Sequence, residues 1–223
     1  MNYRDNKSRK IMFNIFVFLG YFAYDILITF VFLILNINTD KAKGVYLIIT
    51  SIIYLLFLIY LYRKELIDDL GKFKLINVVK YIPIYIIGIL LMAYSNSLLS
   101  NITNIDISKN EELVRQYIKT LPIYMSFSTV VYAPIVEEIT FRKIFKNIFN
   151  NKYLFIILSG CIFGLVHMSL ISTTFNDFLM IIPYIVMGID FSYIYYKSDN
   201  IFTTITLHSI HNLILLIIQF IGG

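Results

Sequence analysis

Six side chains that can do chemistry lie in apolar stretches of this sequence. They are, in chain order, Glu137, Glu138, Arg142, His167, His208 and Asn212. An ionised side chain in the middle of a membrane costs roughly 2.5–3.5 kcal/mol on insertion scales, so such residues rarely stand there without a task.

The first group is the segment Glu137-Glu138-x-x-x-Arg142. On a helix Glu138 and Arg142 are four residues apart and share a face, which predicts an ion pair. Glu137 lies about 100° around the helix from Glu138 and stays free to act as a general base. Pro134 removes a backbone donor just upstream, so we expect the helix to be kinked there.

The second and third groups lie on two later helices. Gly160, Gly164 and His167 share one helical face. Small residues at this spacing let another helix approach closely, and we expect this face to bring His167 against Glu137. His208 and Asn212 are four residues apart and also share a face.

These residue types suit hydrolysis. A carboxylate and an imidazole can share and deprotonate a water molecule, while a second imidazole and a carboxamide stabilise the oxyanion. Alternatively Glu137, His167 and His208 bind a divalent metal such as Zn²⁺, which acidifies the water. The spacing does not decide between the two, and neither a His-Glu-x-x-His motif nor a serine nucleophile elbow is present.

Composition shows what kind of molecule must position these residues. Of the 223 residues 58% are hydrophobic and the mean hydropathy is +0.75, against roughly 45–50% apolar residues in a soluble domain. The chain is therefore predicted to be a membrane protein. Its net charge of +5 is scattered between apolar runs, which favours lipid contacts over nucleic acid. The single Cys161 excludes an intramolecular disulfide.

The pattern predicts an all-α bundle with about seven transmembrane spans in one integral domain, residues 1–223. Each apolar run is close to the roughly 20 residues that cross a bilayer. The expected spans are 11–35, 45–62, 81–99, 121–142, 153–170, 178–196 and 201–221. Charged and apolar residues alternate at 63–80, which indicates an amphipathic segment on the membrane surface, broken near Gly71. Glu111 and Glu112 are expected in a short helix of the longest polar stretch.

Loop charges predict the orientation in the cell membrane. The N-terminus and the segments 63–80, 143–152 and 197–200 hold 13 Lys or Arg residues, and the alternate set of loops holds 5. Because positively charged loops stay in the cytoplasm, we expect a cytoplasmic N-terminus and an external C-terminus. Glu137 and Glu138 then lie near the cytoplasmic end of their span.

The motifs Glu137-Glu138-x-x-x-Arg142, Phe163-x-x-x-His167 and His208-x-x-x-Asn212 together resemble those of the CAAX protease and bacteriocin-processing family (CPBP, or Abi). That family includes the eukaryotic Ras-converting prenyl-protein endopeptidases. The resemblance covers about residues 120–215, which are expected to form the catalytic core. The spans in 1–119 are the variable part.

The resemblance implies an intramembrane endopeptidase that cleaves a membrane-associated peptide or protein. In such an enzyme Glu137 and His167 activate water, and His208 and Asn212 form the oxyanion hole. Glu138 and Arg142 support the site. The family is often called a metalloprotease, although a metal-free mechanism fits these residues equally well. The implied roles are bacteriocin immunity or maturation, or pheromone processing.

Three other ionisable residues lie in the spans outside these motifs. Asp25 is expected to be hydrogen-bonded to a neighbouring helix, and Asp190 to be a helix-packing carboxylate. His211 receives no role. Two other classes of function stay open. A regulator or immunity protein that acts by binding keeps its effect without Glu137 and His208, and a transporter moves a solute and cuts no peptide. The sequence does not indicate the oligomeric state.

Overall fold

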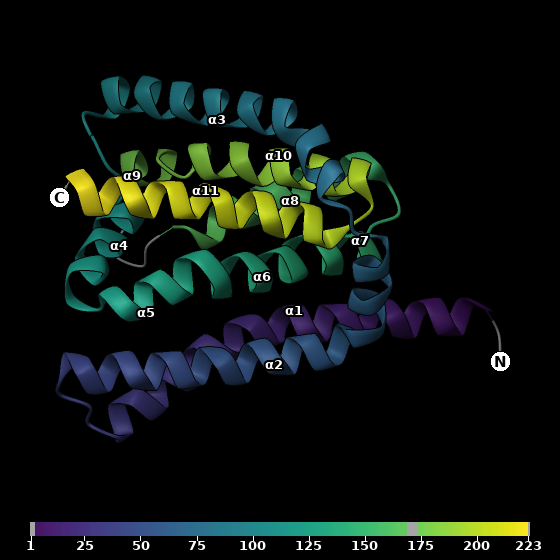
Figure 1. Cartoon of the computed structure of the whole chain (residues 1–223), viewed down its shortest axis with the longest axis horizontal. Coiled ribbons are helices and arrows are strands. Elements are labelled where there is room, and N and C mark those ends of the chain that lie inside the picture. Colours follow the sequence, from purple (N-terminus) through teal and green to yellow (C-terminus); the bar gives the residue numbers. More distant parts are fainter. Residues whose placement is uncertain (1–2, 169–173, 223) are drawn as a thin grey trace.

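The computed structural model describes residues 3–168 and 174–222, and these residues form helices and no strand (Figure 1). Three long helices open the chain: α1 (Tyr3–Ile34), α2 (Asp40–Lys72) and α3 (Leu75–Thr103). The short helix α4 (Lys109–Thr120) follows and contains Glu111 and Glu112, as predicted. The remaining elements are α5 (Pro122–Phe127), η1 (Ser128–Tyr132), α6 (Ala133–Glu137), η2 (Glu138–Lys143), α7 (Ile144–Ile148), α8 (Lys152–Val166), α9 (Phe175–Leu179), α10 (Ile182–Ser198) and α11 (Ile201–Gly222).

Five helical stretches in this described part are long and apolar enough to cross a membrane. They are Lys7–Ile34, Asp40–Lys72, Leu75–Thr103, Phe175–Ser198 and Ile201–Ile221. The helix α8 is apolar but has 15 residues, or about 22 Å at 1.5 Å per residue. The segment predicted to span at 121–142 is divided among several short elements. The chain is therefore a multi-pass, all-helical membrane protein, and a total of seven crossings stays a prediction.

The amphipathic segment expected at 63–80 is not a separate element. Residues 63–72 are the last turns of α2 and residues 75–80 begin α3. The chain turns at Phe73 and Lys74 instead of Gly71. The reason is that the buried stripe of α2 continues through its C-terminal turns, where the side chains of Leu66 and Asp69 are buried.

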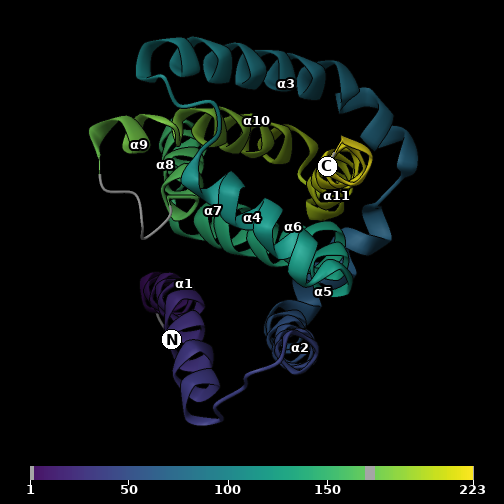
Figure 2. The ribbon, with the colours of Figure 1, turned by 90° about the vertical axis from the view of Figure 1, so that its left-hand side faces the viewer.

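The helices lie in layers (Figures 1 and 2). Both views place α1 and α2 at one side of the molecule and α3 at the opposite side, with the later helices between them. Within this interior α10 packs against both α8 and α3. The central helices therefore lie where side chains from several elements can meet.

Contacts at the two ends of the bundle separate the loops into the two sets that their charges indicate. At one end Lys143 is paired with Asp69, and Lys146 with Asp199. At the other end Gln219 donates a hydrogen bond to Glu111. Further contacts at this second end are Asn176 with Thr103 and Lys43 with the ring of Tyr117. All the loops rich in Lys and Arg thus share one end, which we call the basic end.

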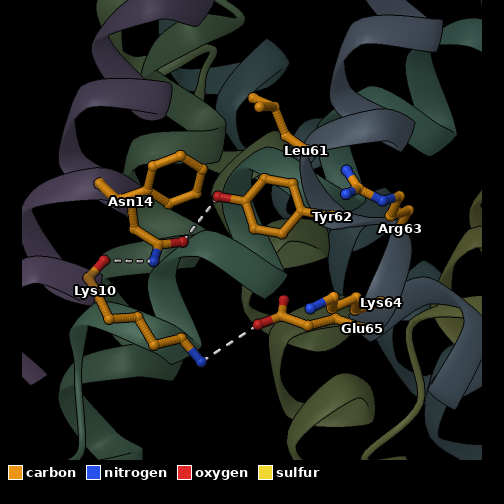
Figure 3. A pocket seen from close by; sticks show the side chains of 8 residues that line it. Lys10, Asn14, Leu61, Tyr62, Arg63, Lys64 and Glu65 are labelled. Atoms are coloured by element: carbon orange, nitrogen blue, oxygen red, sulfur yellow. Dashed lines mark hydrogen bonds and ion pairs between the residues drawn. The ribbon is translucent and has the colours of Figure 1, made fainter. Parts of the chain in front are cut away.

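At the basic end α1 meets α2 beside a small pocket (Figure 3). The Tyr62 hydroxyl donates to Asn14 Oδ1 at 2.8 Å, and the Asn14 amide donates to the Lys10 carbonyl at 2.7 Å. Lys10 also forms an ion pair with Glu65 at 3.3 Å. Polar contacts therefore fix the start of α1 against the end of α2.

The run from Pro122 to Ile148 is one continuous helical course interrupted by two π turns, η1 and η2. In η1 the Ala133 amide bonds the Ser128 carbonyl, and in η2 the Ile144 amide bonds the Ile139 carbonyl. The first π turn ends directly before Ala133-Pro134 and takes up the loss of the proline donor, so the course stays helical there. Each π turn admits one extra residue, and the two flank Glu137.

Candidate active site

The ion pair predicted between Glu138 and Arg142 is present in the interior. Arg142 Nε lies 3.3 Å from Glu138 Oε2, and both side chains are fully buried, at 0% exposure. Since an isolated buried charge is expensive, each residue depends on the other to remain ionised there.

His208 connects this pair to the second glutamate. Its Nδ1 lies 3.0 Å from Glu138 Oε1, and its Nε2 lies 3.8 Å from Glu137 Oε2. The first contact is a hydrogen bond, whereas the second is too long for one. Glu138 therefore orients the imidazole so that Nε2 faces Glu137, and a water molecule beside the gap can contact both atoms.

Aromatic rings fix His208 from two sides. Phe191 of α10 stacks on the imidazole with centroids 4.8 Å apart, and Phe163 of α8 meets it edge-on at 6.0 Å. Phe163 also lies under the Arg142 guanidinium, 4.6 Å from the ring centroid. Thr204, one turn before His208, is buried beside Glu138.

A pair of serines completes the surroundings of Arg142. Arg142 Nη1 donates to Ser159 Oγ at 3.1 Å, and Ser159 and Ser192 share a hydrogen bond of 2.8 Å. These serines join α8 to α10 and direct the guanidinium toward Glu138. Neither serine could be predicted from the sequence, because a serine in an apolar span gives no indication of the partner that it faces.

His167 caps the C-terminus of α8 at the edge of this cluster. Its Nδ1–H donates to the Phe163 carbonyl at 2.7 Å, which leaves Nε2 as the proton acceptor. Its ring stacks on Tyr184 at 4.6 Å. The Glu137 carboxylate is near enough to interact electrostatically with the imidazole, although the two make no direct hydrogen bond in the described part of the chain.

The glycine face of α8 packs differently from expectation. A Cβ on Gly160 would lie 2.4 Å from Ile189 Cγ1, and one on Gly164 would lie 2.2 Å from Ile185 Cγ1. The partner of this face is therefore α10, and not the helix that carries Glu137. The close approach of α8 and α10 brings Ser159 next to Ser192 and Phe163 next to Gly188.

Asn212 lies one turn beyond His208 on α11, and its side-chain amide donates to the Thr129 carbonyl in η1 at 2.9 Å. One amide hydrogen is thus used by the π turn and the second stays available.

Glu137 and Glu138 lie about 16 Å from Ile148 along the helical course, at 1.5 Å per residue. They therefore lie well inside the helical course, which runs on past Arg142 to Ile148.

The three ionisable residues outside the motifs, His211, Asp190 and Asp25, have different surroundings. His211 is hydrogen-bonded to the Tyr85 hydroxyl at 3.1 Å and joins α11 to α3. Asp190 packs against Gly88 of α3, as a helix-packing carboxylate should. The expected hydrogen bond from Asp25 to a neighbouring helix is absent among the described residues, and its side chain is exposed.

The three candidate metal ligands do not come together as a metal site. Among residues 3–168 and 174–222, no group of three or more His, Cys, Asp and Glu side chains is arranged to hold an ion. Glu138 occupies one nitrogen of His208, and the Phe163 carbonyl occupies one nitrogen of His167. Both hydrogen bonds hold Nδ1 and leave the two Nε2 atoms free, which is also how metal-binding histidines are held by a neighbouring oxygen.

Comparisons with known proteins identify the region that holds this cluster. The model of the type II CAAX prenyl endopeptidase Rce1-like family matches residues 119–214. The chain is 30% identical over 115 residues to YdiL of Bacillus subtilis, which is named a putative membrane peptidase. The matched residues make up 50% of this chain and 43% of YdiL. The chain is 31% identical over 125 residues to the membrane-embedded CAAX protease MroQ of Staphylococcus aureus, covering 52% and 47%.

A longer match is to an uncharacterized protein of Mycoplasma capricolum, at 31% identity over 223 residues, covering 92% of this chain and 65% of the relative. The chain thus spans between about two fifths and two thirds of these relatives. No solved structure matches it. Residues 119–214, which contain every member of the cluster, are thus the part of the chain that is similar to the type II CAAX prenyl endopeptidases.

Proposed function

We propose that this protein is an intramembrane endopeptidase whose general base is Glu137. The observation that carries the proposal is the position of His208 between two glutamates, bonded to the one that Arg142 holds and facing the other. A fixed imidazole beside a free carboxylate is suited to holding one water molecule and one peptide carbonyl.

The proposed reaction uses only side chains of this chain. Glu137, with His167 as its partner, removes a proton from water, and the water oxygen attacks the carbonyl carbon of the substrate. The oxyanion accepts hydrogen bonds from the free amide hydrogen of Asn212 and from Nε2–H of His208, which acts as the doubly protonated imidazolium with its Nδ1–H donated to Glu138. Glu137 then gives its proton to the leaving nitrogen as the C–N bond breaks. Glu138 and Arg142 position His208 and do not touch the substrate.

We further propose that residues 120–215 form the catalytic core and that the helices of residues 1–119 are the variable part that packs around it. The common position of the positively charged loops supports a cytoplasmic basic end, and hence a cytoplasmic N-terminus and an external C-terminus. A membrane-bound peptide precursor, as in bacteriocin immunity or maturation or in pheromone processing, is the substrate class that we propose.

The decisive experiment uses purified protein in lipid nanodiscs and a library of quenched fluorescent peptides. We expect Glu137→Gln to lower kcat/KM by about 10²–10⁴-fold, the usual contribution of a general base. The matched control is Glu112→Gln, since the Glu112 side chain is 57% exposed in α4 and lies far from the cluster. Full activity of Glu137→Gln would refute the assignment.

The same assay with and without a chelator tests metal dependence. A metal-free reaction keeps its rate after chelation and dialysis. Activity that is lost on chelation and restored by added Zn²⁺ would show that a metal activates the water, in place of Glu137 and His167. Purified protein that cuts no peptide, with phenotypes that survive Glu137→Gln, would favour a regulator that acts by binding.

A further inference from the structure

Asp25 is a carboxylate in the middle of α1 that no part of the reaction described above uses. It belongs to the stripe Asn14, Phe18, Tyr21, Asp25 and Ile28, spaced by four and three residues. The other members of this stripe are buried or half-buried against the rest of the molecule. Asp25 therefore faces the protein, and its exposure means that no side chain in the described part covers it.

Three tyrosines lie near the Asp25 side chain. Tyr21, Tyr54 and Tyr132 all lie close enough to interact electrostatically with the Asp25 carboxylate. Tyr54 is only 4% exposed and is held by stacking on Tyr24 at 4.3 Å, yet its hydroxyl has no hydrogen-bond partner among the described residues. A buried hydroxyl without a partner destabilises the protein, and a ligand that supplies a hydrogen bond removes this cost.

One side chain separates this position from the proposed base. Tyr21 interacts electrostatically with both Asp25 and Glu137, and its ring meets Phe141 of η2 edge-on at 5.6 Å. An extended peptide advances about 3.3 Å per residue. A substrate whose scissile bond lies at Glu137 therefore brings a residue only a few positions away next to Asp25.

No described Lys, Arg or His forms an ion pair with Asp25. An unpaired carboxylate inside an apolar helix is costly, and a cation from the substrate removes that cost. Tyrosine rings add cation–π attraction. We propose that Asp25, with Tyr54 and Tyr132, is a subsite for a positively charged residue of the substrate, a Lys or an Arg. This inference rests on the proposed peptidase function.

The test uses a neutral peptide that the purified protein cleaves. A single Lys is placed in turn at each of the positions flanking the scissile bond, and each peptide is paired with its norleucine counterpart, which has the same length and no charge. We expect one position at which Lys raises kcat/KM about tenfold or more, chiefly through KM. In Asp25→Asn the kcat/KM for the Lys peptide should be about equal to that for its norleucine counterpart. Asp25→Lys should favour a peptide with Glu at the same position.

Asp68→Asn is the matched control, because Asp68 is an exposed carboxylate on α2 away from the cluster. It should keep the Lys preference. An Asp25→Asn protein that also keeps it, or a wild-type protein with no such position, would overturn the subsite.

A second measurement separates this inference from the proposed function. Binding of the same labelled peptides to Glu137→Gln is measured by fluorescence anisotropy, with and without Asp25→Asn. Tighter binding of one Lys peptide that disappears with Asp25→Asn supports the subsite even where no cleavage occurs. Equal affinity for every Lys and norleucine pair contradicts it.

Discussion

Arg142 and Lys143 are neighbours in the sequence, both are buried, and each is paired with one carboxylate. Arg142 reaches Glu138 in the interior, where both side chains are at 0% exposure. Lys143 reaches Asp69 at the basic end, where the two side chains are 7% and 12% exposed. Consecutive cations in one π turn therefore serve different purposes: Arg142 positions the cluster around His208, and Lys143 joins α2 to the central run.

The largest effect is expected from Arg142→Gln. The change leaves Glu138 buried without its counter-charge, which costs about 3–5 kcal/mol of stability. It also releases the carboxylate that orients His208, and a misplacement near 1 Å costs about 10²-fold in rate. Thermal unfolding in detergent and peptide cleavage measure the two losses.

The double variant Glu138→Gln/Arg142→Gln shows whether charge is the cause. Because it removes both buried charges, it should be more stable than Arg142→Gln alone. An Arg142→Gln protein as stable and active as the wild type would show that the Glu138–Arg142 pair does not position the cluster, and so does not differ in role from the Asp69–Lys143 pair.

Glu138→Gln alone should lower kcat/KM by about 10–100-fold, the usual cost of losing a carboxylate that orients a functional imidazole. The amide oxygen still accepts the His208 Nδ1–H bond, but without the charge. The loss should be mostly in kcat, since Glu138 does not touch the substrate. An effect confined to KM would instead place Glu138 in substrate binding.

Lys143→Met should affect stability and spare the chemistry. It leaves Asp69 mostly buried without its partner and should lower the free energy of unfolding by about 1–3 kcal/mol. The kcat/KM of the folded protein should stay within about twofold of the wild type, because the pair is separate from the cluster. A large fall in kcat with normal stability would show that the two pairs are coupled.

The smallest contrast concerns glycines. Gly160→Ala places a Cβ 2.6 Å from the Ile189 backbone nitrogen, so α8 must move away from α10. We expect a loss of about 1–3 kcal/mol, as for other overpacked cores. Gly20→Ala on α1 meets nothing within 4 Å, and should be neutral or stabilise the helix by up to about 1 kcal/mol. Thermal unfolding of both variants in the same detergent checks the contrast.

Sequence spacing was sufficient for the parts of the site that lie on one helix. The pair Glu138 and Arg142 follows from a separation of four residues, and the membrane class follows from composition. The order of positively charged loops also predicted which loops share an end. All of these depend on local periodicity or on the cost of charge in lipid.

Spacing was insufficient wherever two helices meet. The face of Gly160 and Gly164 was recognisable, but its partner α10 was not, because any helix can approach a glycine face. The hydrogen bond that Asn212 donates to Thr129 depends on the tertiary fold. The two π turns could not be predicted either, since the missing donor of Pro134 indicates an irregularity in the helix but not its form.

These π turns have a consequence for how the protein tolerates change in length. An inserted residue in an α-helix rotates everything after it by about 100°, and a π turn is such an insertion made permanent. Deleting one residue between 128 and 132 would let the segment wind as a regular α-helix. Glu137 and Glu138 would then swing away from His208 while the chain kept its hydrophobic character. The alignment of Glu137 and Glu138 with His208 thus depends on a single residue of backbone length.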